Sequence, residues 1–320
     1  MQPELSVILV VGERRDRVAP ALASVLAQDA IDRLEILLLD LGPGDPPPVQ
    51  GSDHPAVRTV KLPPDTLFST AKAGAVRMAS APVVVFLEEH CRTHPGWARA
   101  LIEAHRGPWA GVGAEVHNGN PEVALSRTIQ VLNYLWWLPP APRAEFEMLP
   151  GHNSSFKRDL LLAYGDELEE LLRAEIVLHT RLRRDGYRLL LEPAAKFSHI
   201  NESSLGSALR GRFLFNRCYG PMRARAFGWS LARRLFYAAA LPVFPFYTLS
   251  RLLQYAALRR PERLVQVIAG APLLLVVQLA SAAGHSLGLL FGPGDAEARF
   301  SLFEMNEFRR HQEHVVRNQG

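Results

Sequence analysis

Short apolar runs alternate with amphipathic helical patterns through the first third of the chain. Four runs predict strands, residues 5–11, 34–39, 83–87 and 109–116, and residues 57–62 could form one more. Helical spacing separates them, as in the series Phe68, Ala71, Ala75, Val76 and Ala79. The run 83–87 is apolar at every position, which is typical of a strand covered on both faces inside a parallel sheet. The alternation predicts an α/β fold, with a doubly wound, mostly parallel sheet flanked by helices.

The next segment continues the pattern with more helix. Apolar spacing predicts helices over residues 95–105, 120–137, 157–164 and 167–184. Residues 188–191 predict a further strand, and a short run then leads past Pro193 to His199.

The last third has a different character. Residues 235–250 and 265–294 contain no Asp, Glu, Lys or Arg, although prolines interrupt the first run and Pro272, Gly284 and Gly288 interrupt the second. The second run exceeds the roughly 20 residues that cross a bilayer. If both runs crossed, the arginines between them would lie outside, against the positive-inside tendency. We therefore expect interfacial or re-entrant helices with at most one span, and a buried hairpin of a soluble domain is the alternative.

Composition adds two constraints on partners and location. The 320 residues carry a formal net charge of +4, but the arginines crowd one stretch: Arg210, Arg212, Arg217, Arg223, Arg225, Arg233 and Arg234. Such a cluster suits phosphate ligands or an anionic membrane surface, and no nucleic-acid-binding motif accompanies it. Two cysteines, Cys91 and Cys218, favour a reducing compartment. We expect a domain over residues 1–215 and a hydrophobic, basic, membrane-associated helical region over residues 216–320, at the cytoplasmic face of the cell membrane, with no nucleic-acid partner.

Three polar residues follow the apolar run 83–87 directly: Glu88, Glu89 and His90. Open α/β sheets bind ligands at the carboxyl ends of their strands. Carboxylate and imidazole donors suit a divalent cation, and a cation at this edge suits a phosphorylated substrate. The alternative is an ordinary exit of a strand into solvent.

Several segments, in order, resemble those of the family 2 glycosyltransferases over roughly residues 5–215. They are Ser6-Val7-Ile8-Leu9, residues 34–40 ending in Asp40, Ala71-Lys72-Ala73-Gly74, residues 86–91 followed by His94-Pro95-Gly96-Trp97, Arg173-Ala174-Glu175-Ile176, and residues 181–188. The resemblance implies the GT-A fold. The chain departs from the family pattern, with Val10-Val11 for Pro-Thr, Leu41 for a second Asp, Glu88 and His90 for Asp-x-Asp, and Ala174-Glu175 for Glu-Asp.

The resemblance also implies roles for individual residues. Glu175 would be the catalytic base, and the donor would contact Glu13, Asp40, Lys72, Glu88, Glu89, His152 and Asn153. The metal ligands would be His90, Glu88 and His199, holding Mn²⁺ or Mg²⁺, and the imidazole of His90 favours Mn²⁺. Inversion at the sugar carbon follows if Glu175 acts as a simple base.

The function expected from these features is a membrane-associated glycosyltransferase. It would move a sugar from a nucleotide-diphosphate sugar to a lipid-linked or polysaccharide (glycan) acceptor. The altered motifs leave open a non-catalytic nucleotide-sugar-binding or scaffold protein of an envelope polysaccharide assembly. A nucleotidyltransferase is a third reading, but no Gly-rich basic loop follows the first strand.

Overall fold

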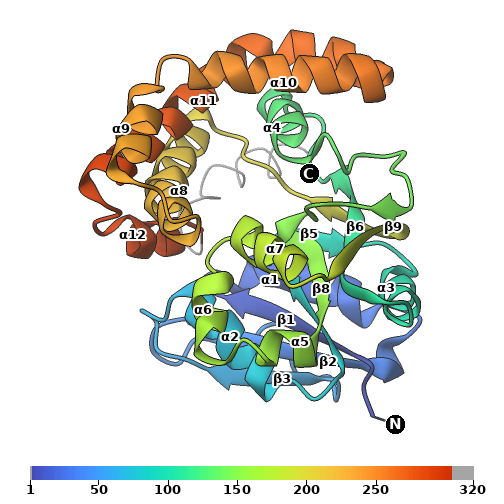
Figure 1. The fold of residues 1–320 in the computed structure, drawn as a ribbon. Coiled ribbons are helices and arrows are strands. Elements are labelled where there is room, and N and C mark those ends of the chain that lie inside the picture. Colours follow the sequence, from blue (N-terminus) through green and yellow to red (C-terminus); the bar gives the residue numbers. More distant parts are fainter. Residues whose placement is uncertain (1, 305–320) are drawn as a thin grey trace. The chain divides into compact units, whose positions relative to one another are not determined.

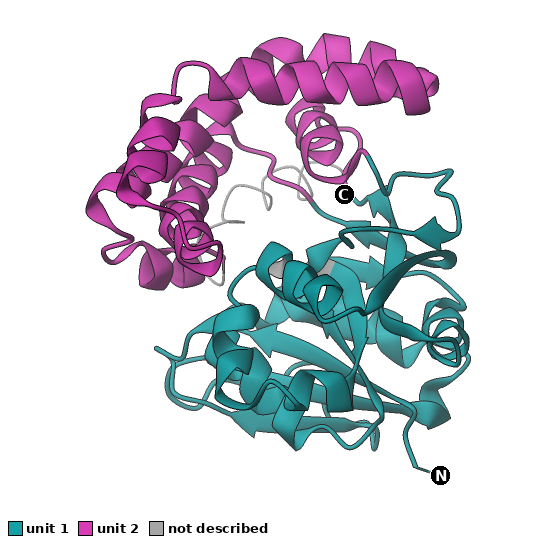
Figure 2. Cartoon of the chain, in the orientation of Figure 1, with its two compact units in different colours: residues 1–119, 136–200 teal, residues 120–135, 201–320 magenta. Residues whose placement is uncertain are grey.

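The computed structural model describes residues 2–304, and for His152 and Glu175 only the backbone. The chain divides into two compact units, one formed by Met1–Gly119 and Trp136–Ile200, the other by Asn120–Leu135 and Asn201–Gly320 (Figure 2). The expected domain boundary after residue 215 lies inside helix α8 (Leu205–Ala226), whereas the compact units part after residue 200.

The first unit is built on one sheet (Figure 1). Its strand order is β3-β2-β1-β4-β8-β6-β9-β5, and β7 pairs with β9 off this path. The strands are β1 (Leu5–Val11), β2 (Leu34–Asp40), β3 (Val57–Lys61), β4 (Val83–Leu87), β5 (Cys91–Thr93), β6 (Trp109–Asn118), β7 (Ala144–Glu145), β8 (Ser154–Lys157) and β9 (Arg188–His199). β1 pairs parallel to β2 and β4, and β2 pairs parallel to β3. The predicted α/β sheet flanked by helices is confirmed.

The other part of the sheet contains antiparallel pairs that the apolar pattern did not predict. β8 lies antiparallel between β4 and β6, and both β5 and β7 run antiparallel to β9. These strands are only two to four residues long and rich in serine or charged residues, so they carry no apolar run. β9 continues through Pro193 because its pairing with β6 is irregular there, stepping from Glu192 to Lys196.

Six helices accompany the sheet within the described part of the first unit: α1 (Arg15–Leu26), α2 (Phe68–Met78), α3 (Trp97–His105), α5 (Arg158–Leu162), α6 (Leu168–Leu171) and α7 (Glu175–Arg184). The single helix expected over residues 167–184 is broken. Ala174 is extended, with φ −149° and ψ 130°, and 2% exposed, so α7 begins afresh at Glu175. The break makes Glu175 the first residue of a helix.

The described residues of the second unit form α4 (Ala124–Tyr134), α8, α9 (Leu231–Ala239), α10 (Phe244–Arg259), α11 (Leu264–Phe291) and α12 (Ala296–Leu302). The chain passes into this unit twice, at Asn120 and at Asn201, and these two residues bind each other. The Asn120 side chain donates to the Asn201 carbonyl oxygen and accepts from the Asn201 N–H, both at 2.9 Å. These bonds join the two points at which the chain enters the second unit.

α11 is continuous over 28 residues, through Pro272 and both glycines that we expected to interrupt it. A Cβ at Gly284 or Gly288 would collide with the backbone oxygens of Phe213 and Arg217 on α8, so the glycines allow close helix packing. The stretch Pro261–Phe291 is the one described helix long and apolar enough to cross a membrane, with a mean hydropathy of 2.0 and 33% of the most apolar window buried.

Candidate active site

Glu88, His90 and His199 converge at the carboxyl end of β4. The Nε2 atoms of the two histidines lie 2.9 Å apart. The Oε2 atom of Glu88 lies 3.0 Å from Nε2 of His90 and 3.4 Å from Nε2 of His199. The side chains of His90 and His199 are 5% and 6% exposed, and that of Glu88 is 26% exposed. The cluster is therefore enclosed on the histidine side and reached by solvent on the glutamate side.

The backbone explains why residues 109 positions apart meet. After β4 the chain turns at once into β5, with the Cys91 N–H donating to the Glu88 carbonyl oxygen at 2.9 Å. β5 then pairs with the end of β9, where Cys91 lies opposite His199. The Ile200 N–H donates to the His90 carbonyl oxygen at 3.3 Å, and the Gly119 N–H to the His199 carbonyl oxygen at 2.8 Å. Backbone hydrogen bonds therefore fix the turn after β4 against the end of β9.

These side chains fit a divalent cation by their chemistry and their separations. Ligand atoms about 2.1 Å from an ion, at angles between octahedral and tetrahedral values, lie about 3.0 to 3.4 Å from one another. Two of the three separations, 3.0 and 3.4 Å, fall in this range, and the third, 2.9 Å between the two histidine nitrogens, lies just below it. One ligand atom from each of Glu88, Cys91 and His199 also lies within 4.8 Å of the other two. The predicted metal ligands thus form one cluster that could hold an ion, with Cys91 beside it.

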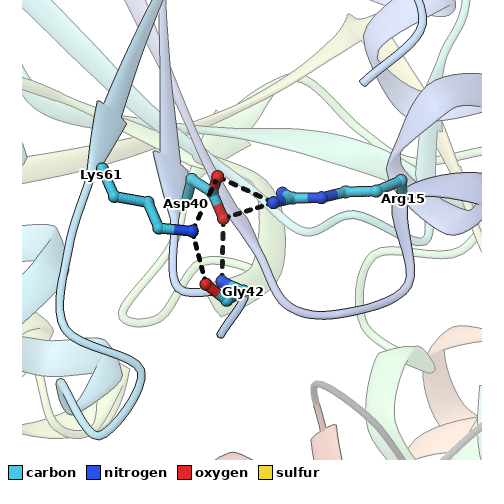
Figure 3. A network of polar contacts seen from close by, with 4 residues as sticks. All are labelled: Arg15, Asp40, Gly42 and Lys61. Atoms are coloured by element: carbon cyan, nitrogen blue, oxygen red, sulfur yellow. Dashed lines mark hydrogen bonds and ion pairs between the residues drawn. The ribbon is translucent and has the colours of Figure 1, made fainter. Parts of the chain in front are cut away.

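Asp40 is the centre of a second polar network at the same edge of the sheet (Figure 3). Both of its carboxylate oxygens accept from Nη2 of Arg15, at 2.8 and 2.7 Å. Oδ1 also accepts from the Gly42 N–H at 2.8 Å, and Nζ of Lys61 lies 3.5 Å from Oδ2. Lys61 in turn donates to the Gly42 carbonyl oxygen at 2.5 Å. The network fixes the loop that follows β2.

This network controls the ionisation of Asp40. Burial alone would raise the pKa of the carboxyl group. The hydrogen bonds from Arg15 and from the Gly42 N–H, together with the charges of Arg15 and Lys61, outweigh burial and lower the pKa below its usual value. Asp40 is thus held as a carboxylate. β1 separates β2 from β4, so the Asp40 network and the Glu88 cluster begin two strands apart, about 10 Å at the usual strand spacing.

The remaining predicted donor contacts are spread around this edge. Glu13 is exposed in the loop between β1 and α1. Lys72 lies on α2 with its ammonium 5.6 Å from the ring centroid of Phe86, near the end of β4. Glu89 follows Glu88 and is 9% exposed. Contact of Glu13, Lys72 and Glu89 with the nucleotide sugar therefore stays a prediction.

Asn153 has a structural partner. It is fully buried, and its Oδ1 accepts from Nε1 of Trp97 at 2.9 Å. The bond ties the turn Gly151–Asn153 to the start of α3, just after Pro95-Gly96. His152 lies in the same turn, and Glu175 opens α7. Among the predicted site residues, the structure brings Glu88, His90 and His199 into contact, while Asp40 belongs to the second network.

Our sequence interpretation missed three residues of these clusters. Arg15 and Lys61 hold Asp40, and Cys91 lies beside the candidate metal ligands. Lys61 is the last residue of β3, which pairs with β2. Knowledge of the strand order would therefore have indicated that Lys61 lies near Asp40. Cys91 directly follows His90, but nothing in the apolar pattern indicated a strand β5 opposite His199.

Comparison with known proteins gives an independent view. The family model described as Glycosyl transferase family 2 matches residues 6–159. No curated protein matches. Among solved structures, the chain is similar to "Crystal structure of GalNAc-T7 with UDP, GalNAc and Mn2+", with 12% sequence identity and a TM-score of 0.47. That alignment covers 62% of this chain and 43% of that one, so the chain spans less than half of that protein's length.

The family match runs from β1 to the beginning of α5, and so contains Asp40, Glu88 and His90. It ends before Glu175 and His199. The resemblance seen in the sequence is confirmed over residues 6–159, which match the model of glycosyl transferase family 2.

Proposed function

We propose that the protein transfers a sugar from a nucleotide-diphosphate sugar to a lipid-linked or polysaccharide acceptor, with a divalent cation and with inversion at the sugar carbon. The observation that supports this most strongly is the convergence of Glu88, His90 and His199 at the ligand-binding edge of a family 2 domain. We place this activity at the cytoplasmic face of the cell membrane.

Glu88, His90 and His199 are the residues that would hold the cation. A bound divalent cation supplies Lewis-acid stabilisation of the negative charge on a departing diphosphate. The two imidazoles favour Mn²⁺ over Mg²⁺, which prefers an all-oxygen environment. The two buried imidazoles fix the positions of two ligand nitrogens. Because solvent reaches the side chain of Glu88, the nucleotide sugar can approach the ion from that side.

Asp40 supports recognition of the nucleotide. Because Arg15, Lys61 and Gly42 fix its carboxylate, the carboxylate presents an oriented acceptor for a base or ribose hydroxyl. Lys72, held beside Phe86, contributes a positive charge near the end of β4. Glu13 and Glu89 complete the proposed donor contacts, and Asn153 acts by positioning Trp97 and the turn that carries His152.

Glu175 is the proposed general base. It would take the proton of the acceptor hydroxyl as that oxygen forms its bond to the sugar carbon. The bond from that carbon to the diphosphate oxygen breaks on the opposite side, and the leaving group departs as nucleoside diphosphate. Attack opposite to departure inverts the configuration of the carbon.

The second unit supports an acceptor that is linked to a membrane lipid. Pro261–Phe291 is long and apolar enough to cross a bilayer. Large apolar side chains elsewhere in the unit are also more than half exposed: Leu231, Phe236, Val243, Phe246, Tyr247 and Leu258. Arginines accompany them, and the combination of exposed apolar and basic groups is typical of proteins that lie at an anionic membrane surface.

The test is release of nucleoside diphosphate from a panel of nucleotide sugars by the full chain, with membrane lipid extract or glycan as acceptor. We expect release to require both acceptor and cation. Glu175→Gln keeps a similar volume but removes the base, and should reduce turnover about 10²- to 10⁴-fold while donor binding persists. Donor binding with no turnover by the unaltered protein, under any acceptor, would contradict transfer and support a scaffold.

A further inference from the structure

The cluster at the end of β4 includes a thiol that neither the family resemblance nor the proposed mechanism uses. Cys91 is fully buried and lies directly opposite His199 in the antiparallel pair of β5 and β9. Directly opposite residues of such a pair have their side chains on the same face of the sheet. Cys91 and His199 therefore face the same side, which is the side where Glu88 and His90 meet His199.

The distances agree with this placement. The Sγ atom of Cys91 lies within 4.8 Å of a carboxylate oxygen of Glu88 and of a ring nitrogen of His199. Buried cysteines commonly act as small apolar fillers. A filler position needs no neighbouring ligand atoms, whereas this thiol has a carboxylate and an imidazole within reach of one shared ion.

We propose that Cys91 is a ligand of this centre together with Glu88 and His199, and that the centre therefore prefers an ion of the zinc class over Mg²⁺ or Mn²⁺. The inference rests on the cation centre proposed above and concerns which ion the centre takes. The carboxylate of Glu88, a ring nitrogen of His199 and the thiolate of Cys91 form a mixed oxygen, nitrogen and sulfur donor set that suits Zn²⁺ or Co²⁺. Mg²⁺ demands oxygen ligands in octahedral geometry, and Mn²⁺ lies below Co²⁺ and Zn²⁺ in affinity for such sites. On binding, the S–H bond is replaced by a sulfur–metal bond, and the proton passes to solvent.

Cobalt spectroscopy of the full chain tests the ligand without any need for turnover. The protein is stripped with a chelator and titrated with Co²⁺ alone. A cobalt–thiolate bond gives a near-ultraviolet charge-transfer band, and the visible d–d bands report the ion whatever its ligands are. The chain has two cysteines, so Cys218→Ser leaves Cys91 as the only thiol and needs no change at the site.

We expect the charge-transfer band in the unaltered protein and in Cys218→Ser, and its absence in Cys91→Ser, which keeps the d–d bands. Loss of even an outer partner of a ligand lowers metal affinity about 10- to 100-fold, so Cys91→Ser should weaken Zn²⁺ binding by at least that factor. Excess Mg²⁺ should not displace Co²⁺ from the unaltered protein.

Absence of the charge-transfer band from Cys218→Ser overturns the proposal, even if Cys91→Ser does not fold. Persistence of the band in a folded Cys91→Ser protein overturns it too. His90→Ala separates the two claims, because it should weaken the d–d bands whether or not Cys91 binds. A d–d spectrum without the thiolate band would support the cation centre but contradict Cys91 as its ligand. If no cobalt spectrum appears at all, both the cation centre and the Cys91 ligand are contradicted. A thiolate band without sugar transfer supports the ligand and contradicts the proposed function.

Discussion

Arg15 and Asp40 form an enclosed ion pair, with side chains 11% and 12% exposed. Arg15→Ala should lower the free energy of unfolding by about 1.5 to 3 kcal/mol, because two hydrogen bonds to a charged acceptor are lost while Lys61 and the Gly42 N–H remain. Urea denaturation at neutral pH measures the change. Arg99→Ala is the matched control, since it removes an exposed pair with Asp29 and should cost less than about 1 kcal/mol. Equal losses in the two variants would contradict an enclosed network around Asp40.

Asp40 also predicts a pH dependence with a definite sign. Its pKa is lowered in the folded protein, so its ionised form stabilises the fold at pH values above the unfolded pKa of about 3.9. This contribution is lost as the pH falls through the lower, folded pKa. Asp40→Asn should therefore be less stable than the unaltered protein at pH 7, and the gap should narrow in acid. Denaturation midpoints at pH 7 and pH 3 give the comparison, and a gap that widens in acid would refute the assignment.

At the level of elements, the end of β9 packs closely against Gly119. A Cβ at Gly119 would lie 2.9 Å from Cγ1 of Ile200 and 3.1 Å from the backbone carbon and oxygen of His199. Gly119→Ala should therefore shift His199 and weaken Co²⁺ binding about 10-fold or more, as the loss of a supporting contact does. The measurement is a cobalt titration followed in the visible region.

Gly74→Ala is the control for that substitution. Gly74 lies within α2, and a Cβ there would meet no atom within 4 Å. Alanine in a helix interior should raise the free energy of unfolding by about 0.5 to 1 kcal/mol without altering cobalt affinity. Unchanged cobalt affinity in Gly119→Ala would show that β9 does not position His199.

The elements that the sequence predicted well are those with long apolar runs. β1 and β4 have the predicted bounds, because strands buried on both faces have nearly continuous apolar sequences. β5 and β8 escaped prediction because they are short, and tertiary pairing rather than composition makes them strands. β5 matters most, since its pairing brings Cys91 opposite His199. Glu88, His90 and His199 could thus be predicted from the sequence. Cys91 could not, because it lies on β5, a strand that the sequence did not predict.

On the scale of the whole molecule, α11 predicts how the protein partitions. If α11 is the one span, the full chain should sediment with membranes and resist extraction by alkaline carbonate. Leu279 lies near the middle of α11 and is 47% exposed. Leu279→Arg should shift the protein out of the membrane fraction, since arginine at the centre of a span costs about 2.5 to 3.5 kcal/mol. Leu279→Ile is the apolar control, and release of the unaltered protein by carbonate would contradict a spanning α11.

The central claim is that Glu88, His90 and His199 bind a cation that in turn binds the diphosphate of the donor. Thermal unfolding of the full chain with nucleoside diphosphates, alone and with a divalent cation, tests it most directly, because a ligand of the native state raises the unfolding midpoint. We predict a clear rise for one nucleoside diphosphate only when the cation is present, and its loss in His90→Ala. A rise that is the same without the cation, or the same in His90→Ala, would contradict the account.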